Sequence, residues 1–306
     1  MKKAFKPLSA KEEASLSKEE LISYYNEKVN YNRNAPLNIF YMWLVSAVRK
    51  TFIKVASKIK DYEIVYLNDL ELPDESFIIA TNHKGFNDLP ILLEVIEVPF
   101  HYLAANDIPM PLSVRMLFKL LGAVLIDRNS RDRKRWGLEQ MSKICAQGYY
   151  GAIYPEAVNN FTDSIPLYPF WPGIIDVAKN SGKPILPVIT FDKDNKVYVK
   201  YGRIYRVDFR DNREEAASIL RDIMATLLWE IWETFPLAKR EDVVNSYEPP
   251  NLTRGDITFK PEYELQFVYR PVNPYSPTGE RYVTFEDVID INRNIRISKR
   301  IDCYEV

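Results

Sequence analysis

The sequence contains few of the residues that build disulfide frameworks and metal sites. Its 306 residues include only two cysteines, Cys145 and Cys303, and two histidines, His83 and His101. Two cysteines that form no CxxC pair fit a reducing compartment and argue against a structural disulfide. Zinc sites of the usual spacings draw several ligands from His and Cys, which this chain barely supplies. We therefore expect neither a metal enzyme nor a redox enzyme.

A long apolar run and an excess of one charge are also missing. The most apolar stretch, Leu37 to Val48, ends at Arg49 and is shorter than the roughly 20 residues that a membrane span needs. The lysine-bearing N-terminus has no apolar core of the signal-peptide type. A net charge of -1 disfavours a basic nucleic-acid binder. We expect a cytoplasmic globular protein without a nucleic-acid partner.

Changes in composition divide the chain into four parts. Residues 1–36 are charged and predict a helical arm, and residues 37–60 predict an amphipathic helix. Residues 61–236 alternate between strand-like and helix-like runs, as expected of one large domain. Residues 237–306 are rich in proline and tyrosine and predict an irregular or β extension.

The amphipathic segment has two interpretations. An apolar, aromatic stretch leads into a helix on which Lys50, Lys54 and Lys58 recur on one side, opposite Phe52 and other apolar residues. This pattern is typical of a helix that lies in a membrane interface. It also suits a helix that packs on the domain and presents its lysines to solvent. Both interpretations stay open at this point.

The central region predicts an α/β domain with a mixed, largely parallel sheet flanked by helices. Its strand-like runs are Glu63–Tyr66, Phe77–Ala80, Phe100–Ala104, Ala123–Ile126, Gly151–Tyr154, Ile185–Thr190 and Lys196–Tyr201. Its helix-like runs are Leu89–Val95, Leu112–Leu121, Arg131–Gln147, Gly173–Asn180 and Asn212–Phe235.

One histidine and one aspartate stand where such a sheet places its ligands. His83 follows the strand-like run Phe77–Ala80, and Asp88 comes five residues later at the start of a helix. Residues five apart on one helix point about 140° apart, so His83 must lie in the loop before the helix to meet Asp88. Gly85 gives that loop freedom to fold back. A hydrogen-bonded His and Asp form a general base.

Four stretches, in this order, resemble the motifs of the lysophospholipid and glycerol-phosphate acyltransferase family. They are Asn82-His83-x-x-x-x-Asp88, then Gly122 to Arg128 ending in Asp127-Arg128, then Tyr154-Pro155-Glu156, and then Ile185 to Ile189 with Pro187 inside it. The resemblance covers about Glu63 to Tyr205. It implies a glycerol-phosphate acyltransferase-like fold and an acyltransferase enzyme that needs no metal or cofactor.

The resemblance also implies roles for individual residues. His83, held by Asp88, removes the proton of an acceptor hydroxyl, which then attacks the thioester of an acyl-CoA or acyl-carrier protein. Arg128 holds an anionic group of the acceptor, and Glu156 positions the acceptor. The other expected substrate contacts are Asn82, Gly122, Asp127, Arg131, Pro155 and Pro187, of which Arg131 suits a CoA phosphate. A lipid acceptor and an enzyme at the inner face of the membrane follow from the same resemblance.

The third motif departs from the family. Where the family continues with Gly-Thr-Arg-Ser, this chain has Ala157-Val158-Asn159-Asn160, which lacks the glycine and the cation. The loss of the cation leaves three acceptors open: a lysophospholipid, a glycolipid, or a polyprenyl- or sugar-linked hydroxyl. A binding protein that has lost turnover and a thioesterase stay as alternatives, although no Gly-x-Ser-x-Gly elbow supplies a serine nucleophile.

Overall fold

The computed structural model describes residues 5, 7–9, 12, 13, 15–59, 62–70, 72–85, 88–105, 111–127, 130–160 and 166–235, with the backbone alone for residues 54–59. The chain divides into two units, Met1–Phe235 and Pro236–Val306, and everything below concerns the first. The predicted extension, residues 237–306, lies outside the described residues. So do the side chains of Lys54 and Lys58 in the predicted lysine face.

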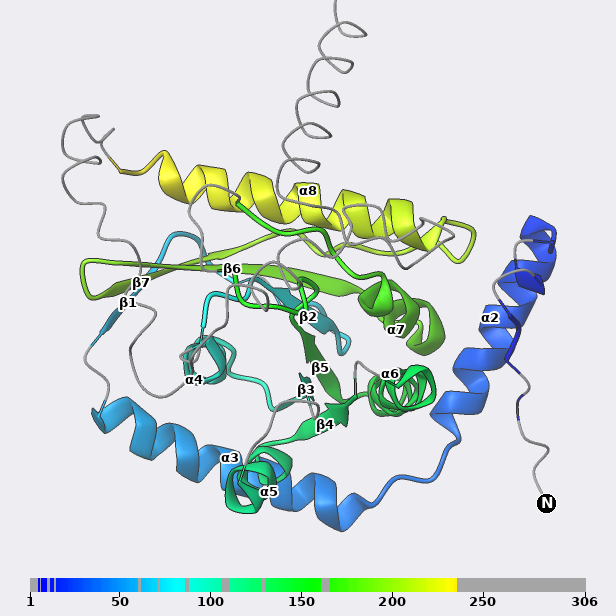
Figure 1. Ribbon diagram of the computed structural model, residues 1–306, viewed down its shortest axis with the longest axis horizontal. Helices are drawn as coiled ribbons and strands as arrows, with labels where there is room; N and C mark the ends of the chain where they lie inside the picture. The colour runs from blue at the N-terminus through cyan, green and yellow to red at the C-terminus, as the bar shows by residue number, and fades with distance from the viewer. Residues whose placement is uncertain are drawn as a thin grey trace, which may run out of the picture. The chain divides into compact units, whose positions relative to one another are not determined.

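A seven-stranded sheet in the order β1-β7-β6-β2-β5-β3-β4 forms the centre of this unit (Figure 1). The strands are β1 (Glu63–Tyr66), β2 (Ile78–Thr81), β3 (Phe100–Ala105), β4 (Ala123–Ile126), β5 (Tyr150–Ile153), β6 (Ile185–Lys193) and β7 (Lys196–Tyr201). All neighbouring strands are parallel except β6 and β7. The prediction of an α/β fold with a mixed, largely parallel sheet is confirmed.

Helices cover both faces of the sheet. Their bounds are α2 (Lys18–Arg33), α3 (Ile39–Ile59), α4 (Asp88–Val95), α5 (Leu112–Leu120), α6 (Arg131–Ala146), α7 (Gly173–Ser181) and α8 (Arg213–Trp232). Side chains of α6, α7 and α8 share one core cluster with Ile78 and Ala80 of β2. Side chains of α4, with contributions from α3 and α5, share the other with Phe77 and Ile79. Successive residues of a strand point to opposite faces, so β2 is buried on both.

The antiparallel pair β6 and β7 is a two-residue hairpin. Asp194 and Asn195 have φ of 53° and 58°, the left-handed geometry of a type I′ turn. Pro187 lies in β6 opposite Gly202, which follows the end of β7. The Gly202 amide donates to the Pro187 carbonyl. A proline is tolerated there because no strand needs its missing N–H.

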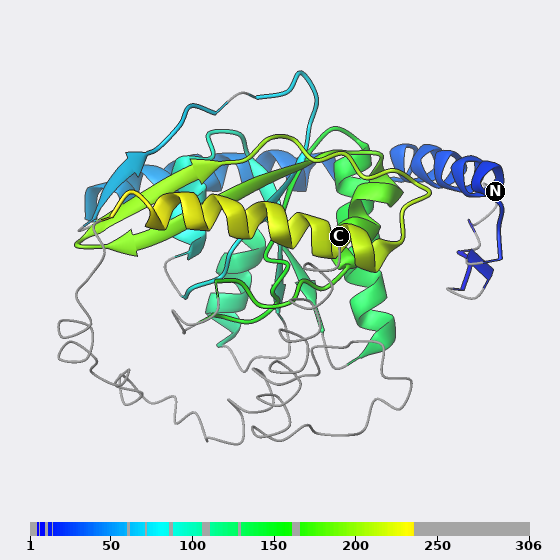
Figure 2. The ribbon, with the colours of Figure 1, turned by 90° about the horizontal axis from the view of Figure 1, so that it is seen from above.

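Helix α8 lies along β6 and β7 in both views (Figures 1 and 2). Asn212 caps its start by accepting from the amides of Glu214 and Glu215. The apolar side of α8 is buried for the most part, although Ile219 is 45% exposed. The buried members are Ala216, Ala217, Leu220, Met224, Leu227, Leu228 and Ile231.

Helix α3 packs on the domain through one side and is open on the other. Met42, Val45 and Arg49 are buried, and the Arg49 guanidinium donates to the Ile96 carbonyl beyond α4 at 2.9 Å. The Arg49 guanidinium also lies 3.9 Å from the ring centroid of Phe100. The predicted apolar turn and basic helix are therefore one continuous helix. Its packing on the domain is observed, and its membrane role stays a prediction.

Candidate active site

The carboxyl ends of β2 and β5 lie side by side in the middle of the sheet. These strands pair in parallel, with Ala80 opposite Ile153. The chain leaves β2 toward α4 on one face and leaves β5 toward α7 on the other. Adjacent strands whose connections depart to opposite faces mark the usual ligand site of an open α/β sheet.

His83 and Asp88 are in contact just beyond the carboxyl end of β2. Asp88 is the first residue of α4 and His83 lies in the preceding loop, which confirms the expected local geometry. The His83 Nδ1 is 2.6 Å from the Asp88 Oδ2, and this oxygen also accepts from the amides of Lys84 at 2.7 Å and Gly85 at 2.9 Å. A carboxylate accepts only, so Nδ1 carries the proton and Nε2 is the basic nitrogen. The His83 side chain is 28% exposed and that of Asp88 only 7%, so the dyad has a solvent-facing histidine and a sheltered carboxylate.

Glu156 holds the backbone of His83 from the neighbouring loop. Its carboxylate is buried and accepts from the amide of His83 at 3.0 Å and the amide of Tyr168 at 2.8 Å. The Asn160 amide returns a hydrogen bond to the His83 carbonyl at 2.6 Å. Burial raises the pKa of Glu156 to about 7, opposed by the hydrogen bonds from Tyr168 and His83. The Glu156 carboxylate therefore fixes the protein's own backbone at His83, and the acceptor contact expected for it stays a prediction.

Asn82 is likewise engaged with the protein. Its amide donates to the Thr190 carbonyl at 2.9 Å and accepts from the Thr190 N–H at 3.0 Å. Asn82 thus continues the pairing of β2 with β6 for one more residue, just before His83. Because both polar ends of its buried side chain are used, Asn82 fixes the start of the loop.

Gly122 lies at the opposite end of the sheet from His83. It precedes β4 with φ of 99°, and a Cβ there would come within 3.2 Å of the Phe100 carbonyl and 3.1 Å of Val45. Glycine is needed for this turn and for the close approach of α3. Gly122 and His83 lie at opposite ends of parallel strands, and the substrate contact expected for Gly122 stays a prediction.

The second motif ends between β4 and α6, away from His83. Arg128 lies outside the described residues. Asp127 follows β4 and accepts from Arg133 at 3.4 Å, while Arg131 begins α6 and is exposed. Strands β5 and β3 lie between β2 and β4, which places the end of β4 about 14 Å from that of β2. Substrate contacts of Asp127, Arg128 and Arg131 stay predictions.

The two prolines of the later motifs have backbone contacts. The Pro155 carbonyl accepts from the Trp171 amide at 2.8 Å, which ties the loop after β5 to the start of α7. Pro187 lies inside β6, opposite Ala80, and precedes the end of that strand by several residues. Their expected substrate contacts stay predictions.

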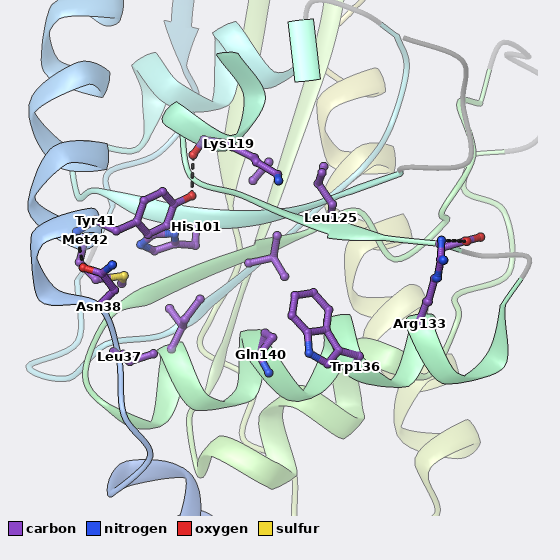
Figure 3. A pocket seen from close by; sticks show the side chains of 14 residues that line it. Leu37, Asn38, Tyr41, Met42, His101, Lys119, Leu125, Arg133, Trp136 and Gln140 are labelled. Atoms are coloured by element: carbon purple, nitrogen blue, oxygen red, sulfur yellow. Dashed lines mark hydrogen bonds and ion pairs between the residues drawn. The ribbon is translucent and has the colours of Figure 1, made fainter. Parts of the chain in front are cut away.

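A groove of about 630 Å³ runs between α3 and α6 across β4 (Figure 3). Its lining is mostly apolar in the middle, and the Arg133–Asp127 pair lies at the end near the carboxyl edge of the sheet. At the other end the Tyr41 hydroxyl donates to the Lys119 carbonyl at 2.7 Å. The residues that line it are Leu37, Asn38, Tyr41, Met42, His101, Lys119, Ala123, Val124, Leu125, Asp127, Arg133, Trp136, Gln140 and Ile144.

Within the part of the chain that the structure describes, no three His, Cys, Asp or Glu side chains lie close enough together to hold a metal ion. No helix in these ranges is long and apolar enough to cross a membrane.

Sequence reasoning missed the partners that hold the dyad in place. The amides of Lys84 and Gly85 on Asp88, and the amide of Asn160 on His83, are backbone groups without a residue-type signal. In the sequence, Asn160 stands out only as a departure from the family motif. Its contact with His83 joins residues 77 positions apart, which depends on the pairing of β5 with β2.

Comparisons with known proteins agree with this arrangement. Residues 59–190 match the family model described as Acyltransferase, and this range contains all four motifs. The fold is similar to that of the 1-acyl-sn-glycerophosphate (LPA) acyltransferase PlsC from Thermotoga maritima, with 19% sequence identity and a TM-score of 0.50. The match covers 71% of this chain and 91% of that one. No curated protein matches the chain. Residues 59–190, less than half of the chain, therefore form an acyltransferase domain, and the protein is an acyltransferase enzyme.

Proposed function

We propose that this enzyme transfers a fatty acyl group from an acyl thioester to a hydroxyl of a lipid acceptor, with His83 as general base. The observation that carries the proposal is the 2.6 Å contact between His83 Nδ1 and Asp88 Oδ2. Two loop amides fix the same carboxylate oxygen, so the base is oriented before substrate arrives. The donor is acyl-CoA or acyl-carrier protein, and no further cofactor takes part in the proposal.

The proposed reaction moves one proton through His83. Nε2 takes the proton of the acceptor hydroxyl as its oxygen attacks the thioester carbonyl, and the imidazolium is stabilised by Asp88. The tetrahedral intermediate then expels the thiol sulfur, which receives the proton from Nε2. The products are an ester and a free thiol, and His83 returns to its starting state.

The loop after β5 favours an acceptor without a phosphate beside His83. Residues 157–160 carry no cationic side chain, and Asn160 is buried, with its side-chain amide donating to the Pro166 carbonyl at 3.3 Å. This segment therefore offers hydrogen-bonding groups and no charge to an anion. A glycolipid or a polyprenyl- or sugar-linked hydroxyl fits these residues, while a lysophospholipid requires cations from elsewhere in the chain.

The groove across β4 is the proposed place of the acyl chain. Its apolar lining suits a hydrocarbon, and one end is lined by Asp127 and Arg133, which follow the carboxyl end of β4. Arg133 at that end suits an anionic part of the donor, such as the phosphates of CoA or an acidic carrier protein.

The membrane role rests on an apolar face that α3 and α5 share, which we call the α3–α5 face. Ile39, Phe40 and Trp43 of α3 are 75%, 69% and 64% exposed, and Leu112 and Met116 of α5 are 71% and 56% exposed. The two helices contact each other. Large exposed apolar patches mark interaction surfaces, and an aromatic one next to a lipid-processing site suits a bilayer. We place the enzyme at the cytoplasmic face of the membrane through this surface.

A screen of acceptors tests the proposal. The purified protein is given acyl-CoA and a panel of lysophospholipids, glycolipids and polyprenyl or sugar alcohols, while thiol release and lipid products are followed together. Thiol release with a matching acylated lipid supports acyl transfer. Thiol release with free fatty acid supports a thioesterase, and co-purified lipid without thiol release supports a binding protein.

A further inference from the structure

We propose that Tyr154 is a positioning residue that strengthens His83 as a base by covering one face of its imidazole ring. The inference rests on the proposed function, in which that ring takes up a proton at Nε2. Tyr154 follows β5 directly, and His83 follows Thr81 of β2 by two residues, so strand pairing brings the two side chains together. Their ring centroids are 4.5 Å apart with planes at 33°, at the short end of aromatic contacts.

The backbone of His83 is fixed so that this contact persists. Its N–H donates to Glu156 Oε1 at 3.0 Å, and its carbonyl accepts from the Asn160 amide at 2.6 Å. Both partners belong to the segment that Tyr154 begins. The ring is also held at Nδ1 by Asp88, so His83 cannot move away from Tyr154 without breaking several hydrogen bonds.

An aromatic face favours the protonated ring over the neutral one. A cation within about 6 Å of a ring centroid is attracted by the negative face of the π system. The 4.5 Å separation meets this condition for the imidazolium that forms during transfer. Tyr154 therefore acts on the developing charge through His83 and needs no contact with substrate.

Other charged groups surround His83 from each neighbouring element. They are Asp88 of α4, Glu156 after β5 and Lys84 of the same loop, while Asp192 of β6 interacts with Asp88 and Lys84. Burial raises the pKa of Glu156 to about 7, so this carboxyl titrates in the pH range of interest. All four groups stay in place when Tyr154 is replaced, so a comparison among Tyr154 variants isolates the ring.

The hydroxyl of Tyr154 supplies the matched control. It is buried and has no hydrogen-bond partner among the residues that the structure describes. An unpaired buried hydroxyl contributes nothing to holding the ring. Tyr154→Phe therefore keeps the proposed interaction, whereas Tyr154→Leu and Tyr154→Met remove the aromatic face and fill similar space.

The experiment measures kcat/KM against pH for thiol release by the full chain, with folding checked by circular dichroism. Tyr154→Leu and Tyr154→Met are expected to move the midpoint of the acid limb to lower pH by about half to one unit. Their kcat is expected to fall by about threefold because the base is weaker, with KM for the acceptor unchanged. Tyr154→Phe is expected to keep the wild-type midpoint and kcat.

Two results overturn the inference. One is a wild-type midpoint in both folded non-aromatic variants, and the other is an equal shift in Tyr154→Phe, which would assign the effect to the hydroxyl. If only one non-aromatic variant folds, that variant decides. Activity that survives His83→Ala would instead overturn the proposed function, so the two failures are distinct.

Discussion

At the scale of single residues, Ala157 stands in a left-handed conformation at the point where the third motif departs from its family. Its φ of 58° lies in the left-handed region, where the family carries glycine. The Ala157 amide donates to the Tyr154 carbonyl at 3.0 Å, which closes the turn that leads to Glu156 and Asn160. The Ala157 side chain therefore makes this left-handed turn sterically unfavourable.

Replacing Ala157 by glycine is expected to stabilise the protein. The left-handed conformation costs a residue with a Cβ roughly 1 kcal/mol or more, and glycine removes that cost. The free energy of unfolding should rise by about 1 kcal/mol, less the entropy that glycine adds to the unfolded chain. Denaturant unfolding measures it. Ala225→Gly in α8 is the control and should lose about 1 kcal/mol. A loss of stability in both variants would contradict the assigned strain.

His101 predicts an acid-sensitive contribution to stability. Burial lowers its pKa to about 4, although its contact with the Gly122 carbonyl opposes the shift. The folded protein keeps this ring neutral while the unfolded chain takes up a proton below about pH 6.5, so the contribution is lost as the pH falls toward 4. His101→Asn keeps a donor for the Gly122 carbonyl and does not titrate.

The wild type should therefore lose more stability on acidification than His101→Asn. The difference between pH 7 and pH 4.5 is expected to be about 2 to 3 kcal/mol. Denaturant unfolding at both pH values measures it. A gap between the two proteins that stays constant over this range would show that His101 is not held neutral by burial.

At the scale of elements, strand and helix positions followed from periodicity, but their spatial order did not. The strands Glu63–Tyr66, Ala123–Ile126 and Lys196–Tyr201 have the predicted bounds. The insertion of β5 between β2 and β3 brings Glu156 to His83. No local pattern encodes that pairing, which depends on which faces of the helices the sheet can bury.

The same limit explains why the partners of some site residues could not be predicted. Asn82, Glu156 and Gly122 carry motif identities that suggested contacts with substrate. Their partners, Thr190 on β6, the His83 amide and α3, are distant in sequence and become visible only in the fold. The His83 and Asp88 pair was accessible because both members lie in one loop and the helix that follows it.

If the α3–α5 face contacts the membrane, replacing its exposed aromatic residues should weaken membrane binding. Phe40→Ser with Trp43→Ser removes two large exposed aromatic side chains from α3. Burying one such side chain is worth about 1.5 kcal/mol or more, so the double variant should bind vesicles of phosphatidylethanolamine and phosphatidylglycerol at least about tenfold more weakly. Sedimentation with vesicles measures the partition.

Ile219→Ser on α8 is the control for this face, because it removes an exposed apolar side chain from a helix that lies away from α3 and α5 (Figure 1). It should leave vesicle binding unchanged. Equal loss of binding in both variants, or unchanged binding in the α3 variant, would rule out the α3–α5 face as the membrane contact.

At the scale of the whole molecule, one sheet organises every part of the proposed reaction. The base follows the carboxyl end of β2, the loop after β5 fixes it, and one end of the groove lies at Asp127, after the carboxyl end of β4. The acyltransferase match over residues 59–190 covers the base and the loop after β5, and it covers the groove lining except for Leu37, Asn38, Tyr41 and Met42. The α3–α5 face lies outside the dyad and supplies the proposed contact with the lipid phase.

The measurement that tests the central claim most directly is thiol release from acyl-CoA by His83→Ala and Asp88→Asn, with an acceptor found in the screen. His83→Ala should lose at least about a hundredfold in kcat because it removes the base. Asp88→Asn should also lose activity, because the amide holds the wrong tautomer of His83. Both proteins should stay folded by circular dichroism. Turnover in His83→Ala equal to that of the wild type would contradict the account.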